Sequence, residues 1–319
     1  MLSRTAQAIY WMSRYVERAE NVARFIEVNG HLMLDLPLTP ANQWEALLYT
    51  TGDQDLFKQY YAETTRENVI EFLTFHEKNP NSIASCLFAA RENARSIREI
   101  ISSEMWEQIN KFYHMVQKSD RRRAIDSMHA YYTNIKEASH LFTGITYTTM
   151  PRDEAWYFGH LGGLLERADK TSRILDVKYF LLLHSITDIG TPFDNIQWSA
   201  LLKSTSGLEA YRKKHGNINP ENVVEFLILD HVFPRSIQYC LMEAQKTIGA
   251  ITGSPLHTFH NPVEQKLGRL SAQLNYTNIE EIFAIGLHEF LDQTQIDINE
   301  VDQATFETFF TIDPAETSV

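Results

Sequence analysis

Apolar positions recur along this chain every three or four residues, which is the period of an α-helix. The two clearest series are Ile9, Met12, Val16, Ala19, Ala23 and Ile26, and Phe158, Leu161, Leu165, Ala168, Ser172 and Leu175. No stretch sustains the alternation of apolar and polar positions that is typical of a β-strand. The pattern therefore predicts an all-α protein that folds as a helical bundle.

The two halves of the chain resemble each other. A gapless alignment that places Glu67 on Glu221 pairs ENVIEFLTFHEKNPNSIASCL with ENVVEFLILDHVFPRSIQYCL, and 11 of these 21 positions are identical. An offset shorter by five residues pairs VERAENVARFIE with LERADKTSRILD. We therefore predict two tandem, divergent helical repeats of about 150 residues, covering 1–150 and 151–319, which could pack as one body.

Both repeats contain a proline before an apolar stretch, at Asn79-Pro80 and at Phe233-Pro234. Proline is common in the first turn of a helix, where its missing N–H group has no hydrogen-bond partner to lose. The pattern predicts that each proline lies in the first turn of the helix that follows.

Composition restricts the possible classes of function. Hydrophobic residues at 44% and charged residues at 22% are typical of a globular protein, and a net charge of −12 disfavours binding to nucleic acid. The first 29 residues carry several charges, unlike a signal peptide, and no run of about 18 apolar residues could span a membrane. We expect a cytoplasmic location without membrane contact. The two cysteines, Cys86 and Cys240, lie in apolar helical patterns and are expected to be core residues.

Two Glu-Arg pairs occupy matching positions in the repeats. Arg18 and Arg167 fall on largely apolar helix surfaces, where a guanidinium group needs a carboxylate or another anion to offset its desolvation. We predict crossed ion pairs, Glu17 with Arg167 and Arg18 with Glu166. The residues of the two motifs are Glu17, Arg18, Glu20 and Arg24, and Glu166, Arg167, Asp169 and Arg173.

A row of cations occurs in the first repeat only. Helical spacing places four residues on one face of the helix that begins at Pro80: Arg91, Arg95, Arg98 and Ser102. Glu92 and Glu99 are expected to point elsewhere, so the row needs other anions. The acids could come from neighbouring helices: Glu17, Glu20 or Glu104. Alternatively, the row could form a site for a phosphate or a peptide carboxylate, or for a partner protein.

Common catalytic and cofactor motifs are absent from the sequence. There is no G-x-S-x-G, no glycine-rich phosphate loop and no C-x-x-C, and the H-x-x-H pattern of His257 and His260 lacks a third ligand. We therefore expect neither a metal nor a cofactor. If the protein were an enzyme, Glu17 or Glu166 would be the candidate general base, next to arginines that stabilise an oxyanion.

Three stretches carry a resemblance to a known family: ERAENVAR from Glu17, ARENARSIREIISSEMWEQIN from Ala90, and DEAWYFGHLGGLLERADKTSRILDVKYFLL from Asp153. In these stretches the chain resembles the alpha-E superfamily, a bacterial helical family named for its Glu-Arg motif. The resemblance covers essentially the whole chain. It implies an association with an ATP-grasp ligase-like protein and with a transglutaminase-like cysteine peptidase.

That association implies a system that forms or modifies peptides. We expect a non-catalytic helical partner of an ATP-grasp amide ligase, which binds the ligase or its peptide or amino-acid substrate. The alternatives are an enzyme of peptide synthesis or modification that uses the Glu-Arg pairs, and a purely structural subunit of a homo-oligomer.

Overall fold

The structure is a computed structural model, and it describes residues 1–35, 40–182 and 192–311. Within these ranges the chain is helical without any β-strand, as the apolar periodicity predicts. The helices of the first half are α1 (Ser3–Asp35), α2 (Pro40–Thr51), α3 (Gln54–Tyr60), α4 (Arg66–Thr74), α5 (Ile83–Ser96), α6 (Ser103–Gln117), α7 (Arg121–Asp126) and α8 (Met128–Thr149). Those of the second half are α9 (Glu154–Leu182), α10 (Pro192–Ser204), α11 (Leu208–His215), α12 (Pro220–Leu229), α13 (Ile237–Thr252), α14 (Pro262–Tyr276), α15 (Ile279–Ile285), α16 (Leu287–Thr305) and the π-helical turn η2 (Phe306–Phe310).

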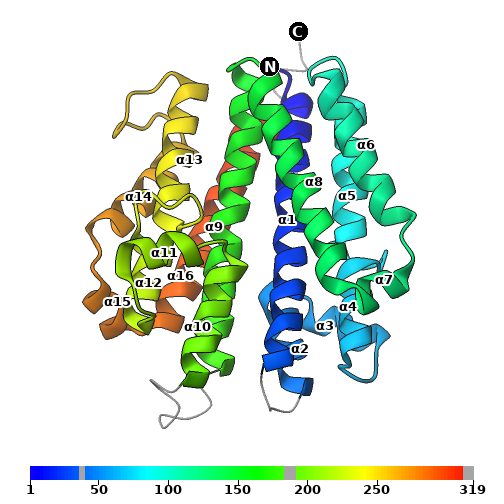
Figure 1. Cartoon of the computed structure of the whole chain (residues 1–319). Helices are drawn as coiled ribbons and strands as arrows, with labels where there is room; N and C mark the ends of the chain where they lie inside the picture. Colours follow the sequence, from blue (N-terminus) through cyan, green and yellow to red (C-terminus); the bar gives the residue numbers. More distant parts are fainter. Residues whose placement is uncertain (36–39, 183–191, 312–319) are drawn as a thin grey trace.

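The long helices form two four-helix bundles that lie side by side (Figure 1). In one bundle α1 packs against α5 and α8, and α6 closes the ring. In the other, α9 packs against α13 and α16, and α14 closes the ring. Each bundle buries the apolar stripe of its helices, and the buried side chains form one continuous core.

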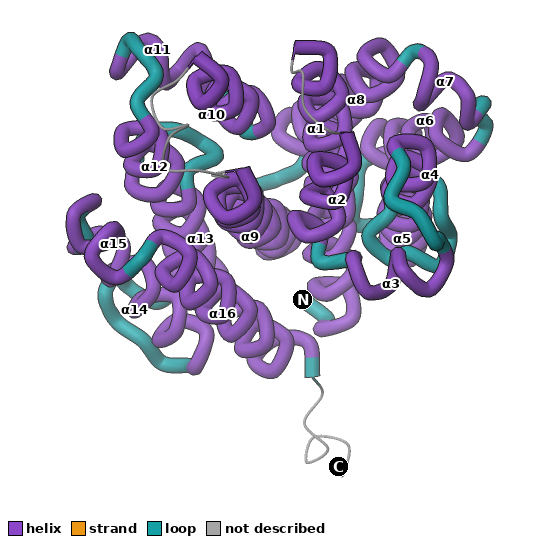
Figure 2. Tube along the Cα trace, turned by 90° about the horizontal axis from the view of Figure 1, so that it is seen from below, coloured by secondary structure: helices purple, strands orange, loops and turns teal. Residues whose placement is uncertain are grey.

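The two bundles are joined through α1 and α9, which lie next to each other in the middle of the molecule (Figure 2). Two shorter helices strengthen the junction by crossing it, because α2 packs against α9 and α10 packs against α1. The longest helix of each half therefore belongs to its own bundle and also to the interface between bundles.

A glycine allows the close approach of the two central helices. A Cβ atom added to Gly162 of α9 would lie 2.4 Å from the backbone oxygen of Tyr10 in α1, whereas one added to Gly163 would have no atom within 4 Å. Tyr10 is buried, and its hydroxyl group donates to Asp302 of α16. Position 162 is thus a contact between backbones, which no larger residue can occupy without displacing a helix.

The predicted position of the prolines in the first turn of a helix is wrong for both Pro80 and Pro234. Helix α5 begins after the N-cap Ser82 and α13 after the N-cap Ser236, so each proline precedes the helix. Each serine side chain accepts a hydrogen bond from the backbone N–H group three residues later, and this cap sets the helix start. The proline carbonyls instead accept contacts from the Cys86 and Cys240 thiols, which are buried and unpaired, as expected of core cysteines.

We expect Gly162→Ala to destabilise the protein, because the added methyl group collides with the backbone of α1. Overpacking of this kind costs about 1–3 kcal/mol in the free energy of unfolding. Gly163→Ala is the matched control: it is expected to leave stability unchanged or to raise it by about 0.4–1 kcal/mol, the usual gain from alanine in a helix. Denaturant unfolding of both variants measures the difference, and equal stabilities would contradict the close packing of α1 on α9.

Candidate functional site

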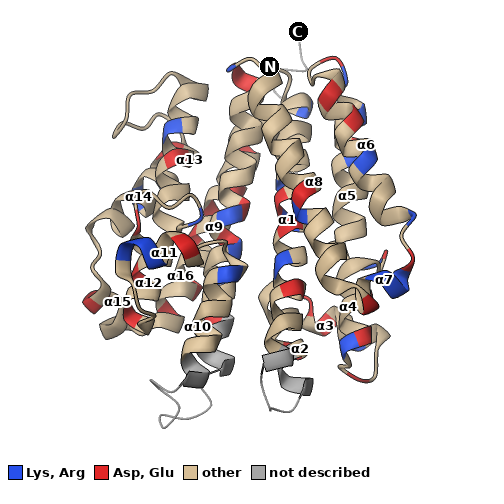
Figure 3. Ribbon diagram, in the orientation of Figure 1, with Lys and Arg blue, Asp and Glu red and all other residues tan. Residues whose placement is uncertain are grey.

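The most unusual feature of the molecule is a layer of buried charged side chains between α1 and α9. Figure 3 shows the Lys and Arg positions in blue and the Asp and Glu positions in red along these two helices. Arg18 of α1 binds both oxygens of Glu166 in α9, with Nε–Oε1 at 2.6 Å and Nη2–Oε2 at 2.9 Å. Arg167 binds Glu17 in the reciprocal manner, with Nε–Oε1 at 3.1 Å and Nη2–Oε2 at 2.8 Å. The predicted crossed ion pairs are therefore confirmed.

The central glutamates also contact further cations that the sequence reasoning missed, two at Glu166 and one at Glu17. The side chain of Glu166 is fully buried, and Arg14 Nε donates to its Oε2 atom at 2.9 Å while Lys170 Nζ lies 3.7 Å from its Oε1 atom. Glu17 accepts from Arg235 Nη1 at 2.9 Å. Arg14 and Lys170 lie at helical spacing from the motifs and could have been found on the helical wheel.

Arg235 could not have been found on a helical wheel, because it lies between α12 and α13. It links Glu17 to Glu20, whose Oε1 atom it contacts at 2.6 Å. In the alignment of the two halves, the position of Arg235 corresponds to Asn81, which accepts from Arg18 at 2.8 Å. One segment thus brings a cation to the layer and the matching segment brings an amide.

The remaining motif residues extend the layer along each helix. Arg24 Nη2 lies 2.7 Å from Glu20 Oε1, and Arg173 Nε lies 2.8 Å from Asp169 Oδ1. In each pair the two residues are one helical turn apart. Ser139 of α8 donates to the second oxygen of Glu20 at 2.8 Å. All eight motif residues therefore lie in one layer, where each carboxylate contacts at least one cation.

Residues 1–310 match a protein family described as a predicted alpha-helical domain with a conserved ER motif. The chain belongs to the alpha-E family. The ER dipeptides of this alpha-E protein are Glu17-Arg18 and Glu166-Arg167, the pairs that cross between the central helices.

Curated relatives of this alpha-E protein include uncharacterized protein Mb2597 of Mycobacterium bovis and uncharacterized protein Rv2567 of Mycobacterium tuberculosis. Each is 20% identical over 303 residues, which cover 89% of this chain and 34% of the relative. The chain thus spans about a third of the length of these relatives. No solved structure matches the chain. Among the described helices, none has the unbroken apolar length that crossing a bilayer requires.

Burial and ion pairing act in opposite directions on the acids of the layer. Burial raises the pKa of the Glu166 carboxyl, but the charges of Arg18, Lys170 and Arg14 outweigh burial and hold that pKa well below its usual range. Burial opposes ionisation of Glu17 as well, and Arg167 with Arg235 lowers its pKa overall. Both glutamates are consequently ionised at neutral pH and are weak proton acceptors.

The expected arginine row is not a single helix face. Helix α5 ends at Ser96, and the chain turns before Ser102 caps α6 by accepting from Met105 N at 3.1 Å. Arg98 lies in this turn. The interruption has a physical reason, since the turn buries both Ile97 and Ile101 while the Ser102 hydroxyl satisfies the new helix start.

The predicted acidic partners of the row are also wrong. Glu92, expected to point elsewhere, binds Arg91 at 2.9 Å and Arg95 at 2.7 Å, whereas Glu17 and Glu20 are engaged in the central layer. The long side chain of Glu92 reaches both arginines from an adjacent position on the wheel. Arg98 lies over the ring of Trp106 at 4.8 Å, with no carboxylate partner among the described residues. One carboxylate therefore serves two of the three guanidinium groups, and the third lies against an aromatic ring.

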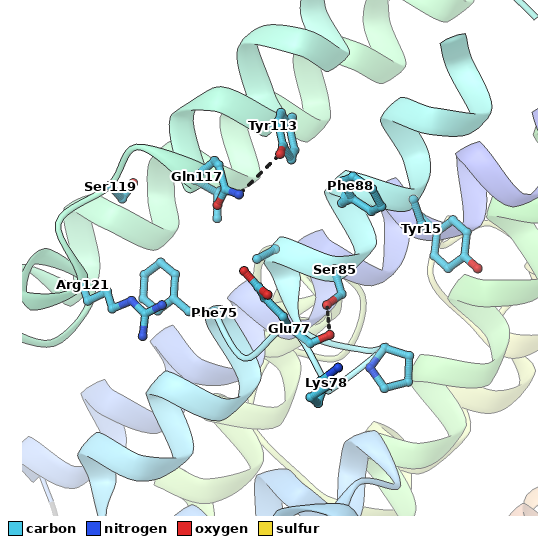
Figure 4. A pocket seen from close by; sticks show the side chains of 14 residues that line it. Tyr15, Phe75, Glu77, Lys78, Ser85, Phe88, Tyr113, Gln117, Ser119 and Arg121 are labelled. Carbon is cyan, nitrogen blue, oxygen red and sulfur yellow. Dashed lines mark hydrogen bonds between the residues drawn. The ribbon is translucent and has the colours of Figure 1, made fainter. Parts of the chain in front are cut away.

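A cavity of about 650 Å³ lies between α5 and α6, and one of its lining residues, Tyr113, is the ring over which Arg91 lies. Figure 4 shows Tyr113 and Gln117 of α6 opposite Ser85 and Phe88 of α5. The cations that line the cavity are Lys78 and Arg121. Its size and its mixture of aromatic and polar groups are typical of sites for small ligands.

A second, smaller cavity of about 180 Å³ reaches the central layer between α1, α8 and α9. Glu17 and Arg167 line it together with Trp156 and His160, whose rings stack at 4.6 Å. Burial and the charge of Arg167 lower the pKa of His160 to about 4. The only histidine among the described residues of this cavity is therefore neutral at physiological pH.

We expect Glu166→Gln to lower the free energy of unfolding by about 3–5 kcal/mol, because it leaves buried cations without their carboxylate. Glu67→Gln is the control, since the Glu67 side chain is 57% exposed and its loss is expected to change stability by no more than about 0.5 kcal/mol. Denaturant titrations measure both variants. A Glu166→Gln protein as stable as the control would show that the layer does not hold the bundles together.

Stability is expected to fall steadily as the pH is lowered from 6.5. The pKa of His160 is about 4 in the folded protein and about 6.5 in the unfolded chain, so on acidification the unfolded chain binds a proton at His160 before the folded protein does. The free energy of unfolding therefore falls between about pH 6.5 and 4. The depressed pKa values of Glu166 and Glu20 add a second loss below about pH 4.3, where unfolded glutamate becomes protonated. Urea midpoints measured from pH 7.5 to 3 should show both ranges, and His160→Gln should remove only the upper one. A rise in stability on acidification would contradict this electrostatic picture.

Proposed function

We propose that this alpha-E protein is a non-catalytic helical partner of an ATP-grasp amide ligase, which binds the ligase and helps to hold its peptide or amino-acid substrate. The observation that carries the proposal is that both ER glutamates are neutralised by arginines inside the protein. A carboxylate that accepts two or three charge-assisted hydrogen bonds stabilises a structure better than it abstracts a proton.

The binding surface of the proposed partner is the α5–α6 patch, which we define as Phe88, Arg91, Arg95, Arg98, Trp106 and Tyr113. Arg91 lies over the rings of Trp106 and Tyr113, at 5.7 and 5.2 Å, and Arg98 lies over Trp106. Arginine and aromatic residues are enriched at the energetic centres of protein interfaces. The excess of guanidinium groups over carboxylates favours an acidic partner surface, although the protein as a whole carries a net charge of −12.

The cavity of about 650 Å³ continues from this patch, because Phe88 and Tyr113 belong to both. Lys78 and Arg121 would provide charge for a substrate carboxylate or phosphate, and the aromatic rings would cover its apolar part. Arg121 is already paired with Glu71 and lies over Phe75 at 5.6 Å, so Lys78 is the better candidate for the ligand's anionic group.

The lengths of the relatives support a role beside another domain. The mycobacterial relatives contain the matching region as about a third of a longer chain. We propose further that the two bundles are copies of one duplicated unit, as the 11 identities between matching segments suggest. In this proposal only the first copy kept the arginines for partner binding, since Gln245 and Gly249 stand where the second copy would place Arg91 and Arg95.

The competing proposal, an enzyme that uses Glu17 as a general base, has one observation in its favour. Glu17 borders the smaller cavity next to His160. Both of its oxygens, however, accept hydrogen bonds from Arg167 or Arg235 at 2.8–3.1 Å, and these cations lower its pKa and make it a weak base. Glu166 is fully buried and does not line the cavities described here.

Charge reversal in the α5–α6 patch tests the proposed partner role. We expect Arg95→Glu with Arg98→Glu to weaken binding to the ATP-grasp protein at least ~10-fold, since like charges would then face each other across the interface. The matched control is Lys213→Glu with Arg269→Glu, which reverses two exposed charges in the second half of the chain and should change the Kd less than about twofold. Biolayer interferometry provides the Kd values. Equal weakening by both pairs, or no binding by the unmodified protein, would contradict the proposal.

A further inference from the structure

A compact cluster of metal-ligating groups lies at the far end of α1, away from the α5–α6 patch. Glu27 and His31 are one turn apart on α1, and His129 is in the first turn of α8, which runs antiparallel to α1 (Figure 1). His31 Nε2 lies 3.3 Å from His129 Nδ1, and His129 Nδ1 lies 2.8 Å from Glu27 Oε1. One ligand atom from each residue lies within 4.8 Å of the other two.

These distances suit a shared cation. Zinc ligands at about 2.0–2.1 Å in a tetrahedral arrangement lie about 3.3–3.4 Å from one another. The separation of the two histidine nitrogens already has this value, and the contact between His129 and Glu27 needs to lengthen by only about 0.5 Å. The third separation, between His31 Nε2 and the Glu27 carboxylate, lies within 4.8 Å, so side-chain rotations that bring it to about 3.3–3.4 Å would complete three corners of a tetrahedron.

The hydrogen bonding of the cluster also leaves a place for a cation. In the tautomers that leave His129 Nδ1 and His31 Nε2 unprotonated, their two lone pairs converge with those of the Glu27 oxygen, whereas a proton on His129 Nδ1 would have to be shared between the Glu27 oxygen and His31 Nε2. A divalent cation in place of this proton would satisfy all three atoms at once. Two neutral histidines and one carboxylate form a donor set that is well known for zinc sites with an open coordination position.

The surroundings hold the carboxylate in a suitable position. Glu27 is 5% exposed, Lys136 binds its Oε2 atom, and Thr133 donates to its Oε1 atom at 3.1 Å. Outer hydrogen bonds of this kind fix the orientation of a ligating group. The His129 side chain is 70% exposed, so an ion could enter from solvent.

The second half of the chain provides an internal comparison. Asp176 stands 149 residues after Glu27, and His288 Nδ1 lies 2.7 Å from its Oδ1 atom. The residue 149 positions after His31 is Phe180. At the matching sequence position, the second half thus has a phenylalanine where the first half has the histidine His31.

We propose that Glu27, His31 and His129 bind one divalent transition-metal ion, with Zn²⁺ as the best fit to the donor set. The remaining coordination position is open to solvent. His31 also lines a cavity of about 670 Å³ that contains Lys203 and Arg212, so an anionic ligand of the metal could be held by these cations. The sequence did not reveal the site because 98 residues separate His31 from His129.

Isothermal titration of the full chain with ZnCl₂ at pH 7.5, with Co²⁺ absorption spectra as a second readout, tests the site. The unmodified protein should bind one ion per chain. His31→Ala and His129→Ala should each weaken binding at least ~100-fold, the upper range seen for loss of an outer-shell group. Both histidines are exposed, so the variants are expected to fold, and far-UV circular dichroism verifies this.

Two control variants separate this site from other histidines. His288→Ala removes the histidine of the two-residue pair, and His257→Ala with His260→Ala removes the H-x-x-H pattern. Neither should change the affinity or the Co²⁺ spectrum. The proposal is overturned if the unmodified protein takes up no ion at a one-to-one ratio, if both His31→Ala and His129→Ala bind as it does, or if a control variant removes binding.

Discussion

The reciprocal ion pairs between α1 and α9 are the interaction on which the rest of this structure depends. An arginine on an apolar helix surface cannot give up its charge, so each central helix requires the acid of the other. This requirement is met twice: Arg18 of α1 pairs with Glu166 of α9, and Arg167 of α9 pairs with Glu17 of α1. The two pairs fix the register of one bundle against the other. Gly162 lets the backbones come close enough for these side chains to meet.

In the proposed function, this constraint separates the residues that hold the scaffold together from the residues that bind a partner. The ER glutamates are used inside the protein, and the groups that remain available to a ligand lie at the periphery. The α5–α6 patch has more guanidinium groups than carboxylates, and the cavity beside it is large enough for a small ligand. In this proposal the ER motif of the family stabilises the scaffold. The residues that bind the partner protein lie in the first half of the chain alone.

The sequence was sufficient for features that depend on local period and on desolvation. Periodicity predicted the all-α fold, and the desolvation of Arg18 and Arg167 on apolar helix surfaces predicted the crossed pairs. The arginine row failed because a helical wheel assumes an unbroken helix, whereas the chain turns at Ile97. Arg235 and His129 were missed because they join their sites only through tertiary packing, and no spacing along the chain reports such contacts.

A double-mutant cycle between Arg18 and Glu166 tests the central claim most directly. The free energies of unfolding of the unmodified protein, Arg18→Met, Glu166→Gln and the double variant give the coupling between the two side chains. The account predicts a coupling of at least about 1 kcal/mol, within the range for residues that share one ion-pair network. Additivity to within about 0.3–0.5 kcal/mol would contradict it, because the two helices would then not depend on each other's charges.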